Sequence, residues 1–434
     1  ADGEIKALWI ACTNPAQSLP DQGTVRRALE RAEFVVVREA FATTATCGYA
    51  DLLLPATTWG EKDGTVTNSE RRISRVRRAV AAPGAARDDW AIAVDFARRL
   101  AARLGRGDGL FPYTDAQAIW LEHRASTRGR DLDITGMSYA MLEAAPQQWP
   151  LPQGASAGRA RLYQDGVFAT PDGRARFANV VYKPVAEPRE ARYPFSLNTG
   201  RLRDQWHGMS RTGTLGRLFG HAPEPVVQMH PQDMARRQLA QGDLVHVTSR
   251  RGSIVLPVAG SSDVALSQVF IAMHWGSETL GGRASTGARL AGVNALTTPS
   301  FCPQSKQPEL KHTAVKVLKA ELPWTLLAMA WFAPGSHPHA HEGLRNLMGD
   351  FAFATCVPFG SGAALQGGGA ERNGLMLRAA DYEAPPPALL ARIEKLLALD
   401  HPETLRYADA RHGKHRAVRV LRSGADVRLT GFLL

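Results

Sequence analysis

The sequence predicts an α/β protein in which a parallel α/β portion is followed by a barrel of short strands and a small mixed α+β segment. Residues 1–60 alternate between strand-like apolar runs and helical patterns, which is typical of a parallel sheet covered by helices. Between residues 193 and 319, short strands are separated by glycine, and this spacing favours a barrel. Residues 322–434 mix both patterns.

The elements of each portion follow from local patterns. Apolar runs predict strands at 5–12, 34–37 and 51–54, and periodicity predicts a helix at 24–32 and a helical turn at 43–49. A longer helix is expected at 88–104, between an acidic start and Gly105. Residues 184–194 have the composition of a linker. Barrel strands are expected at 195–199, 244–249, 254–258, 269–272 and 314–318, with a hairpin at 250–253 and a later helix at 386–399.

Composition limits the classes of function. The 434 residues carry 52 basic and 41 acidic side chains, a net charge of +11, which suits anionic partners or reflects genomic base composition. The four cysteines form no C-x-x-C pair, so the chain contains no zinc ribbon or iron–sulfur run, and a reducing cytoplasm is expected. The longest apolar run, residues 322–333, is interrupted by Pro323 and is too short to cross a bilayer.

Four segments place polar residues where they can meet a ligand. Thr13-Asn14-Pro15 follows the first strand, and it is either a ligand-holding turn or a plain strand-to-helix turn. Residues 51–72 form a polar run in which Lys62 can neutralise phosphate, or which is a solvated surface. Residues 198–213 combine glycines, arginines, a tryptophan and a histidine, which permit close backbone approach, anion contacts and stacking. Asn294 and Lys311 mark a fourth, weaker pair of segments.

Two further patterns are given less weight. The alternate histidines His337, His339 and His341 can ligate a metal in an extended segment, but Pro338 and the following helical pattern favour a surface loop. The basic run Arg71–Arg78 is typical of a nucleic-acid patch, yet no nucleic-acid-binding motif accompanies it.

Taken in order, TNPAQSLP, ADLLLPATTWGEKDGTVTNSERR, NTGRLRDQWHGMSRTG, VNALT and PELKHTAVKV resemble the molybdopterin oxidoreductases of the dimethyl-sulfoxide-reductase type. Within that superfamily, RDQWHGMSRTG and the later LPWTLLAMAW and FATCVPFG are most similar to the catalytic subunit of bacterial assimilatory nitrate reductase. The resemblance covers nearly the whole chain.

The resemblance implies a molybdenum bis-(molybdopterin guanine dinucleotide) cofactor and a set of contacts to it. Asn14, Arg38 and Glu39 would contact one guanosine, Lys62 a phosphate, and Asp89 a guanine or ribose edge. A ten-residue segment would wrap the pterin and pyrophosphate, with Arg201 and His207 as its main side chains: Thr199, Gly200, Arg201, Leu202, Arg203, Asp204, Gln205, Trp206, His207 and Gly208. Asn294 and Lys311 would complete this cradle.

The resemblance also implies three domains. Residues 1–190 would be the end of the α/β portion, residues 193–320 a double-psi β-barrel that caps the cofactor, and residues 321–434 a C-terminal extension. The family's [4Fe–4S] segment and molybdenum ligand have no match here, so no catalytic or metal-ligating residue is expected. The chain is expected to be the C-terminal portion of a longer enzyme and inactive alone.

The expected activity is the reduction of nitrate to nitrite by a cytoplasmic enzyme that receives electrons from ferredoxin, flavodoxin or a reductase subunit. Neither a membrane nor nucleic acid is an expected partner. Two alternatives remain open: a catalytic subunit of formate dehydrogenase type, and a non-enzymatic basic protein that binds nucleic acid.

Overall fold

The computed structural model describes residues 1–107, 109–283, 289, 292–332, 337–361, 372–424 and 426–434. The chain forms two compact units, one of Ala1–Val35, Thr43–Asp51 and Pro184–Leu434 and the other of Val36–Ala42 and Leu52–Lys183. None of the helices in these described residues has both the length and the apolar character needed to cross a membrane.

The first unit begins with the predicted strand and helix. β1 (Ala7–Ala11) leads into the short helix α1 (Pro15–Ser18) and then α2 (Gln22–Arg31). The buried Gln22 side chain donates hydrogen bonds to the carbonyls of Pro15 and Leu19, which fixes the turn between the two helices. The expected helical turn is a 3₁₀ turn at Ala45–Tyr49.

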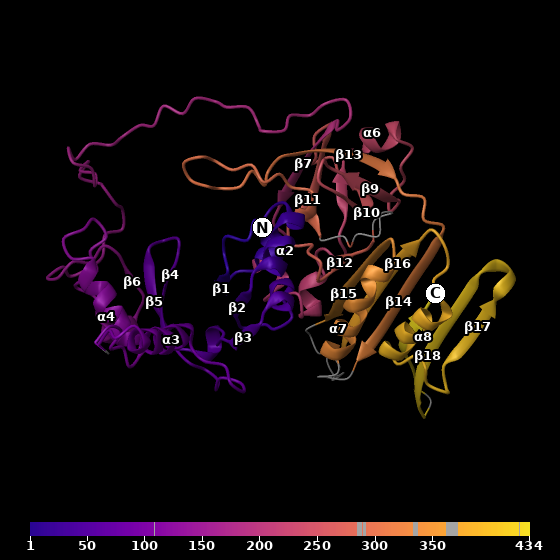
Figure 1. Ribbon diagram of the computed structural model, residues 1–434, viewed down its shortest axis with the longest axis horizontal. Helices are drawn as coiled ribbons and strands as arrows, with labels where there is room; N and C mark the ends of the chain where they lie inside the picture. The colour runs from indigo at the N-terminus through magenta and orange to yellow at the C-terminus, as the bar shows by residue number, and fades with distance from the viewer. Residues whose placement is uncertain (108, 284–288, 290–291, 333–336, 362–371, 425) are drawn as a thin grey trace. The chain divides into compact units, whose positions relative to one another are not determined.

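A closed six-stranded barrel in the first unit confirms the predicted barrel (Figure 1). Its strands are paired in the order β10-β8-β11-β7-β13-β9. Alternate residues such as Phe195 and Leu197 fill the interior, as the period of a strand requires. β7 and β11 are parallel, with Gly200 opposite Ala272, so the loops after them start at the same end of the barrel. The barrel elements are β7 (Phe195–Gly200), β8 (Val227–Met229), α6 (Pro231–Arg236), β9 (Leu244–Thr248), β10 (Ser253–Gly260), β11 (Gln268–Ala272) and β13 (Thr313–Lys319).

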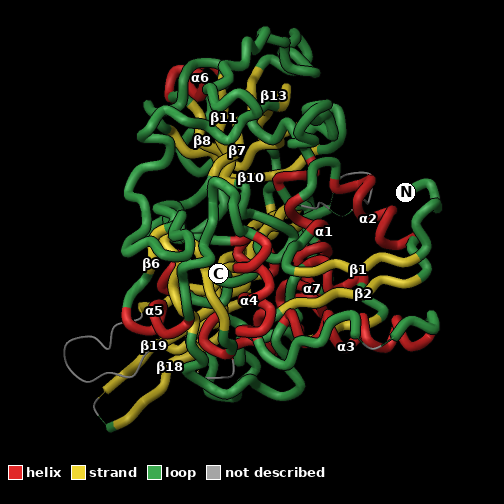
Figure 2. Tube along the Cα trace, turned by 90° about the vertical axis from the view of Figure 1, so that its left-hand side faces the viewer, coloured by secondary structure: helices red, strands yellow, loops and turns green. Residues whose placement is uncertain are grey.

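The C-terminal extension builds a seven-stranded sheet in the order β12-β15-β16-β14-β19-β18-β17. Its edge strand β12 comes from the loop after β11, so the sheet begins within the barrel portion. Two helices share one apolar core with the sheet, and Figure 2 shows β18 and β19 as a long hairpin. The elements are β12 (Leu280–Gly281), β14 (Trp324–Phe332), α7 (His337–Leu347), β15 (Phe353–Ser361), β16 (Arg372–Asp381), α8 (Pro387–Leu396), β17 (Leu405–Asp409), β18 (Lys414–Ser423) and β19 (Asp426–Leu433).

The prediction of a surface loop around the alternate histidines is wrong. His337 opens α7, and His337 and His341 are buried while His339 is exposed. Residues four apart share one helical face, and proline is tolerated in the first turn of a helix, so Pro338 does not prevent the helix. Among the described residues, these histidines join no group of three His, Cys, Asp or Glu side chains that could hold a metal ion.

The second unit contains the rest of the α/β portion. β2 (Phe34–Glu39) enters this unit and pairs in parallel with β3 (Leu52–Pro55) from Val36 to Glu39, which confirms the predicted parallel arrangement there. β4 (Gly64–Thr67), β5 (Arg72–Val76) and β6 (Gln147–Gln148) form a second sheet. The helices are α3 (Asp89–Arg103), α4 (Ala116–Ser126) and α5 (Tyr139–Ala144).

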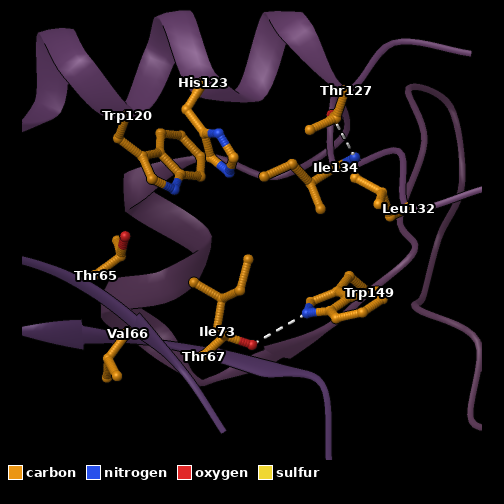
Figure 3. Close-up of a pocket in the computed structure, with 10 residues that line it drawn as sticks. All are labelled: Thr65, Val66, Thr67, Ile73, Trp120, His123, Thr127, Leu132, Ile134 and Trp149. Atoms are coloured by element: carbon orange, nitrogen blue, oxygen red, sulfur yellow. Dashed lines mark hydrogen bonds between the residues drawn. The ribbon is translucent and has the colours of Figure 1, made fainter. Parts of the chain in front are cut away.

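A cavity of about 320 Å³ opens into the core of the second unit (Figure 3). The rings of Trp120 and Trp149 border it, and the Trp149 indole N–H donates to Thr67 Oγ1 at 3.0 Å. Thr127 Oγ1 accepts from the Ile134 amide at 3.0 Å. These polar groups are satisfied by the protein itself, and most of the remaining lining is apolar.

The close packing of β16 in the C-terminal sheet gives a test of the fold. A Cβ on Gly374 would lie 2.7 Å from the Ala330 carbonyl oxygen and would also meet the Phe359 ring, whereas a Cβ on Gly48 would meet nothing within 4 Å. Gly374→Ala should therefore lower the free energy of unfolding by about 1–3 kcal/mol through overpacking. Urea unfolding measures this, with Gly48→Ala as the control. Equal stabilities of the two variants would contradict the described packing.

Candidate functional site

A cavity of about 340 Å³ in the first unit collects residues from widely separated segments. Six of the residues predicted to bind a ligand line it. Its lining is Thr13, Asn14, Gln17, Ser18, Thr199, His207, Gly208, Met273, Asn294, Leu310 and Lys311. The structure therefore brings together the turn after β1, the loop after β7 and both residues of the fourth pair.

The Asn14 side chain is a buried junction in this cavity wall. Asn14 Oδ1 accepts hydrogen bonds from the Thr46 amide at 3.1 Å and the Thr46 hydroxyl at 2.6 Å. Asn14 Nδ2 donates to Gln17 Oε1 at 2.9 Å and Glu278 Oε1 at 3.2 Å. All four hydrogen-bonding positions of the carboxamide are used within the protein. Asn14 consequently fixes the shape of the wall, and ligand contacts from this turn fall to its backbone and neighbours.

Glu278 is a site residue that the sequence reasoning missed. Its carboxylate also accepts from the Ala45 amide at 2.5 Å, so it joins the turn after β1 to the 3₁₀ turn. Burial raises the pKa of the Glu278 carboxyl, while Arg345 and Arg26 act in the opposite direction. No local pattern marks this residue, because its partners lie 233 and 264 positions away in the chain.

The loop after β7 is held in an uncommon backbone conformation. His207, Gly208 and Met209 have φ values of 53°, 61° and 66°, and left-handed φ is costly for the two non-glycine residues. The His207 ring is fixed at both nitrogens, with Nδ1 2.7 Å from Ser210 Oγ and Nε2 3.1 Å from the Cys12 carbonyl. Strain of this kind is maintained by surrounding contacts and gathers at ligand sites.

Lys311 and Thr199 join the far wall to β7. Lys311 Nζ donates to the Thr199 carbonyl at 2.5 Å, and Thr199 Oγ1 donates to the Leu310 carbonyl at 2.7 Å. Asn294 Nδ2 donates to the Gln17 carbonyl at 2.8 Å. The ammonium group of Lys311 therefore borders the cavity at a fixed place, where it can meet an anionic group.

The remaining predicted residues of the loop differ in exposure. Arg201 and Trp206 are exposed, and Arg201 has no ion-pair partner among the described residues. Arg203 forms an ion pair with Asp204 at 2.8 Å. Gln205 is buried, and its side-chain amide nitrogen donates a hydrogen bond to the Leu218 carbonyl. Leu202 packs partly against the barrel core, and a Cβ on Gly200 would lie 2.6 Å from the Phe270 ring.

His274, directly after Met273 of the cavity, is an orphaned ring. It is 2% exposed, and neither ring nitrogen has a hydrogen-bond partner in the part of the chain that the structure describes. Burial lowers its pKa to about 4, and the nearby charge of Arg201 adds to this effect. Buried polar groups are rarely left without partners, so this neutral ring fits a ligand that supplies them. Lys311 lines the cavity, while Arg201 and His274 lie outside its lining. Together the three suit a ligand with anionic and heterocyclic parts that extends beyond the cavity.

The second unit contains the other predicted residues, and three of them meet. Arg38 Nε lies 3.1 Å from Asp89 Oδ1, and Lys62 Nζ lies 3.1 Å from Asp89 Oδ2. Asp89 is the first residue of α3 and also accepts from Arg38 through its backbone carbonyl at 2.8 Å. Two cations around one carboxylate leave a net positive charge that suits phosphate. Glu39 is buried nearby in sequence, and its Oε1 accepts from the Ala40 amide at 2.7 Å.

Comparison with known families and proteins gives consistent matches. The sequence profile described as molybdopterin oxidoreductase matches residues 1–99, and that described as molydopterin dinucleotide binding domain matches residues 195–314. A nitrate reductase of Klebsiella oxytoca is 38% identical over 73% of this chain and 35% of its own length. The F420-dependent formate dehydrogenase subunit alpha of Methanocaldococcus jannaschii is 36% identical over 72% of this chain and 43% of its own. The chain thus spans less than half the length of these curated relatives.

A solved structure shares the fold. Acetylene hydratase from Pelobacter acetylenicus matches with a TM-score of 0.55 at 20% identity, over 73% of this chain and 44% of that one. At this identity the match supports the fold alone, and it agrees with the mixed α/β arrangement and closed barrel described above.

The raised pKa of Glu278 gives a test of this junction. Glu278→Gln keeps a carbonyl acceptor for Ala45 and Asn14 but cannot ionise. Because the folded chain binds the Glu278 proton more tightly than the unfolded chain does, this carboxyl's stabilising contribution is lost as pH rises above 4.5 and through the folded pKa. The stability of Glu278→Gln relative to the parent should therefore increase with pH, by at most about 1.4 kcal/mol per pH unit.

Urea unfolding between pH 4 and pH 8 measures this change. Glu342→Gln, at an exposed carboxyl, is the matched control. A stability difference between Glu278→Gln and the parent that stays constant over this pH range would show that the carboxyl is not held as described.

Proposed function

Because the chain belongs to the molybdopterin oxidoreductase family, we propose that it holds the guanine dinucleotide ends of a molybdenum bis-(molybdopterin guanine dinucleotide) in an enzyme that reduces nitrate to nitrite. The cofactor class rests on the two family matches. The bis-dinucleotide form, the substrate and the position of this chain as the C-terminal portion of a longer enzyme are our proposals.

One observation carries the proposal: segments around Asn14, Thr199, His207, Asn294 and Lys311 converge on one cavity. A ligand that needs so many separate contacts has several chemically distinct parts. A pterin, a pyrophosphate and a guanine in one molecule meet that requirement, whereas a small substrate does not.

The residues suit distinct parts of such a dinucleotide. Lys311 and the exposed Arg201 would neutralise pyrophosphate oxygens, and the orphaned His274 ring would hydrogen-bond a heterocycle or ribose. In the second unit, Arg38 and Lys62 would meet phosphate while Asp89 orients both cations. When bound, the molybdenum group supplies oxygen-atom transfer, by which nitrate, two electrons and two protons become nitrite and water.

Nitrate is preferred over formate because a nitrate reductase is the more similar of the two relatives described above. The formate dehydrogenase relative is nearly as similar, which makes formate the second candidate substrate. Nitrate-dependent and formate-dependent activities of the complete protein separate the two. Formate oxidation without nitrate reduction would overturn the nitrate proposal.

The same proposal includes the remaining parts of the enzyme. A [4Fe–4S] cluster would lie in a segment outside this chain, and ferredoxin, flavodoxin or a reductase subunit would donate electrons. A cytoplasmic location is part of the same proposal, because four cysteines in 434 residues are too few for a disulfide framework. The alternative of a basic nucleic-acid-binding protein accounts for the net charge of +11 but not for the converging cavity.

Cofactor content tests the proposal directly. The complete protein, produced in a host that makes the cofactor, should contain molybdenum and about two guanine nucleotides per metal. Arg201→Ala should lower the guanine content about tenfold, since a charge-assisted contact is worth about 1.5–3 kcal/mol. Elemental analysis and chromatography of released nucleotide measure both quantities.

Arg236→Ala, at an exposed arginine of α6, is the control and should leave the content unchanged. Protein without molybdenum or guanine would overturn the proposal. DNA binding that weakens with salt yet survives Arg201→Ala would then favour the basic nucleic-acid-binding alternative.

A further inference from the structure

A second cavity, of about 150 Å³, lies in the first unit beside residues that continue the loop after β7. Neither family profile covers the extension that provides one of its walls. Three groups of residues line it: Met209, Ser210, Gly213 and Thr214 of the loop; Thr43, Thr44, Glu278 and Thr279; and His337, Pro338, His341, Glu342 and Arg345 of α7.

The extension is joined to this wall by backbone pairing. β12 pairs with β15, placing Leu280 opposite Thr355, and the Cys356 amide donates to the Thr279 carbonyl at 3.1 Å. Because β12 begins two residues after Glu278, this pairing holds the extension against the segment that carries both Glu278 and the cavity residue Met273. Helix α7 shares an apolar core with β15, so the pairing of β12 with β15 also fixes the position of α7 relative to Glu278.

Three buried polar atoms on one face of α7 lack partners. His337 and His341 are each 8% exposed, and their Nε2 atoms have no hydrogen-bond partner among the described residues. The Nε atom of Arg345, one turn further along, is also buried without a partner in the described part of the chain, although another nitrogen of this guanidinium donates to the Thr43 carbonyl. Native proteins satisfy nearly all buried polar groups, so three such atoms on side chains that line one cavity indicate a ligand that supplies the missing bonds.

The tautomer of His341 determines what that ligand must present. A hydrogen bond between the His341 ring and the Cys356 backbone acts to raise the pKa of this ring. A bond with that effect is one in which a ring N–H donates to the Cys356 carbonyl. Since Nε2 has no partner, the donor is Nδ1 and Nε2 carries a lone pair. Burial lowers the pKa of His341 to about 3 and also lowers that of His337, so both rings are neutral at pH 7.

The cavity therefore offers acceptors and a donor side by side. His341 Nε2 and the Glu278 carboxyl accept hydrogen bonds, and the Arg345 Nε–H donates one. A nitrate ion offers acceptors only and leaves His341 Nε2 unsatisfied. The carboxyl groups of Glu278 and Glu342 in the lining disfavour a phosphate anion, and the charge of Arg345 opposes a metal cation. A planar heterocycle with N–H donors beside a carbonyl oxygen carries the kind of partner that each of these groups lacks.

We propose that this cavity binds the 2-amino-4-oxo edge of a planar heterocycle, the edge that pterins and guanine share, and that α7 is thereby part of the cofactor site. The inference rests on the proposed function for the identity of its ligand. The volume equals that of about five water molecules at about 30 Å³ each, which is room for one ring system and not for a whole dinucleotide.

The test uses the complete protein, produced in a host that cannot make molybdopterin. Free pterin, guanosine and adenosine are titrated into it, with pterin fluorescence and calorimetry as readouts. Pterin or guanosine is expected to bind and adenosine is not, because adenine lacks the oxo group and places its amino group elsewhere. The ligand that loses affinity in His341→Asn identifies the part of the cofactor that occupies this cavity, because the complete protein also contains the cavity around Asn14 and Lys311.

Variants of α7 provide matched controls. His341→Asn keeps a donor for the Cys356 carbonyl but removes the acceptor at Nε2, and it should weaken binding about tenfold. His337→Asn tests the second ring independently, and His339→Asn, at the exposed histidine of the same helix, should leave affinity unchanged.

Adenosine binding as tight as that of pterin, or no binding of either pterin or guanosine, would overturn the inference without reference to any variant. Equal affinities for His341→Asn, His337→Asn and His339→Asn would overturn it as well. These outcomes are separate from the molybdenum and guanine content that tests the proposed function, so one proposal can fail while the other stands.

Discussion

The candidate site depends on the buried hydrogen-bond network around Asn14. This carboxamide is 3% exposed and joins Thr46, Gln17 and Glu278. Gln17 in turn donates to the His274 carbonyl at 2.9 Å and accepts from Asn294 through its own carbonyl. Because each buried polar group is costly to leave unsatisfied, loss of one member exposes the others to the same penalty. Four distant segments are thereby held in a single arrangement, and the cavity exists only where they meet.

Local sequence patterns predicted most of the fold and many of the site residues. Alternation of apolar strands and helices predicted the parallel pairing of β2 and β3, and short strands separated by glycine predicted the barrel. Asn14 was found because it follows a strand-like run, and Lys311 because the segment around it resembles the molybdopterin oxidoreductases. Their partners were not found, since hydrogen bonds such as that between Asn14 and Glu278 join residues 264 positions apart and no local pattern encodes them.

Two differences between sequence and structure have a clear physical origin. Pro338 and the helical pattern after it were interpreted as a surface loop at the histidines. In the first turn of a helix, however, a proline lacks only an amide that has no intrahelical partner, so α7 forms and buries His337 and His341. Arg38, Lys62 and Asp89 were each predicted as separate cofactor contacts, and the structure shows them first as contacts of one another. Arg38 and Lys62 both pair with the one carboxylate of Asp89. One positive charge is therefore left over, and it is available to a ligand.

The polarity of the first unit is divided in a way that matches the parts of a dinucleotide. Residues within the family profiles supply the cations, Lys311 and Arg201, together with the strained turn at His207. The extension beyond residue 314 supplies neutral imidazoles and one guanidinium on a single helical face. Anionic oxygens bind best to cations that are not already paired with carboxylates of the protein. A neutral ring edge instead needs fixed acceptors and a donor in a cavity without water. A molecule with both kinds of group is held best when the two environments are built by different segments, because burial that keeps His341 neutral would weaken a phosphate site. The pairing of β12 with β15 is what brings these two environments side by side.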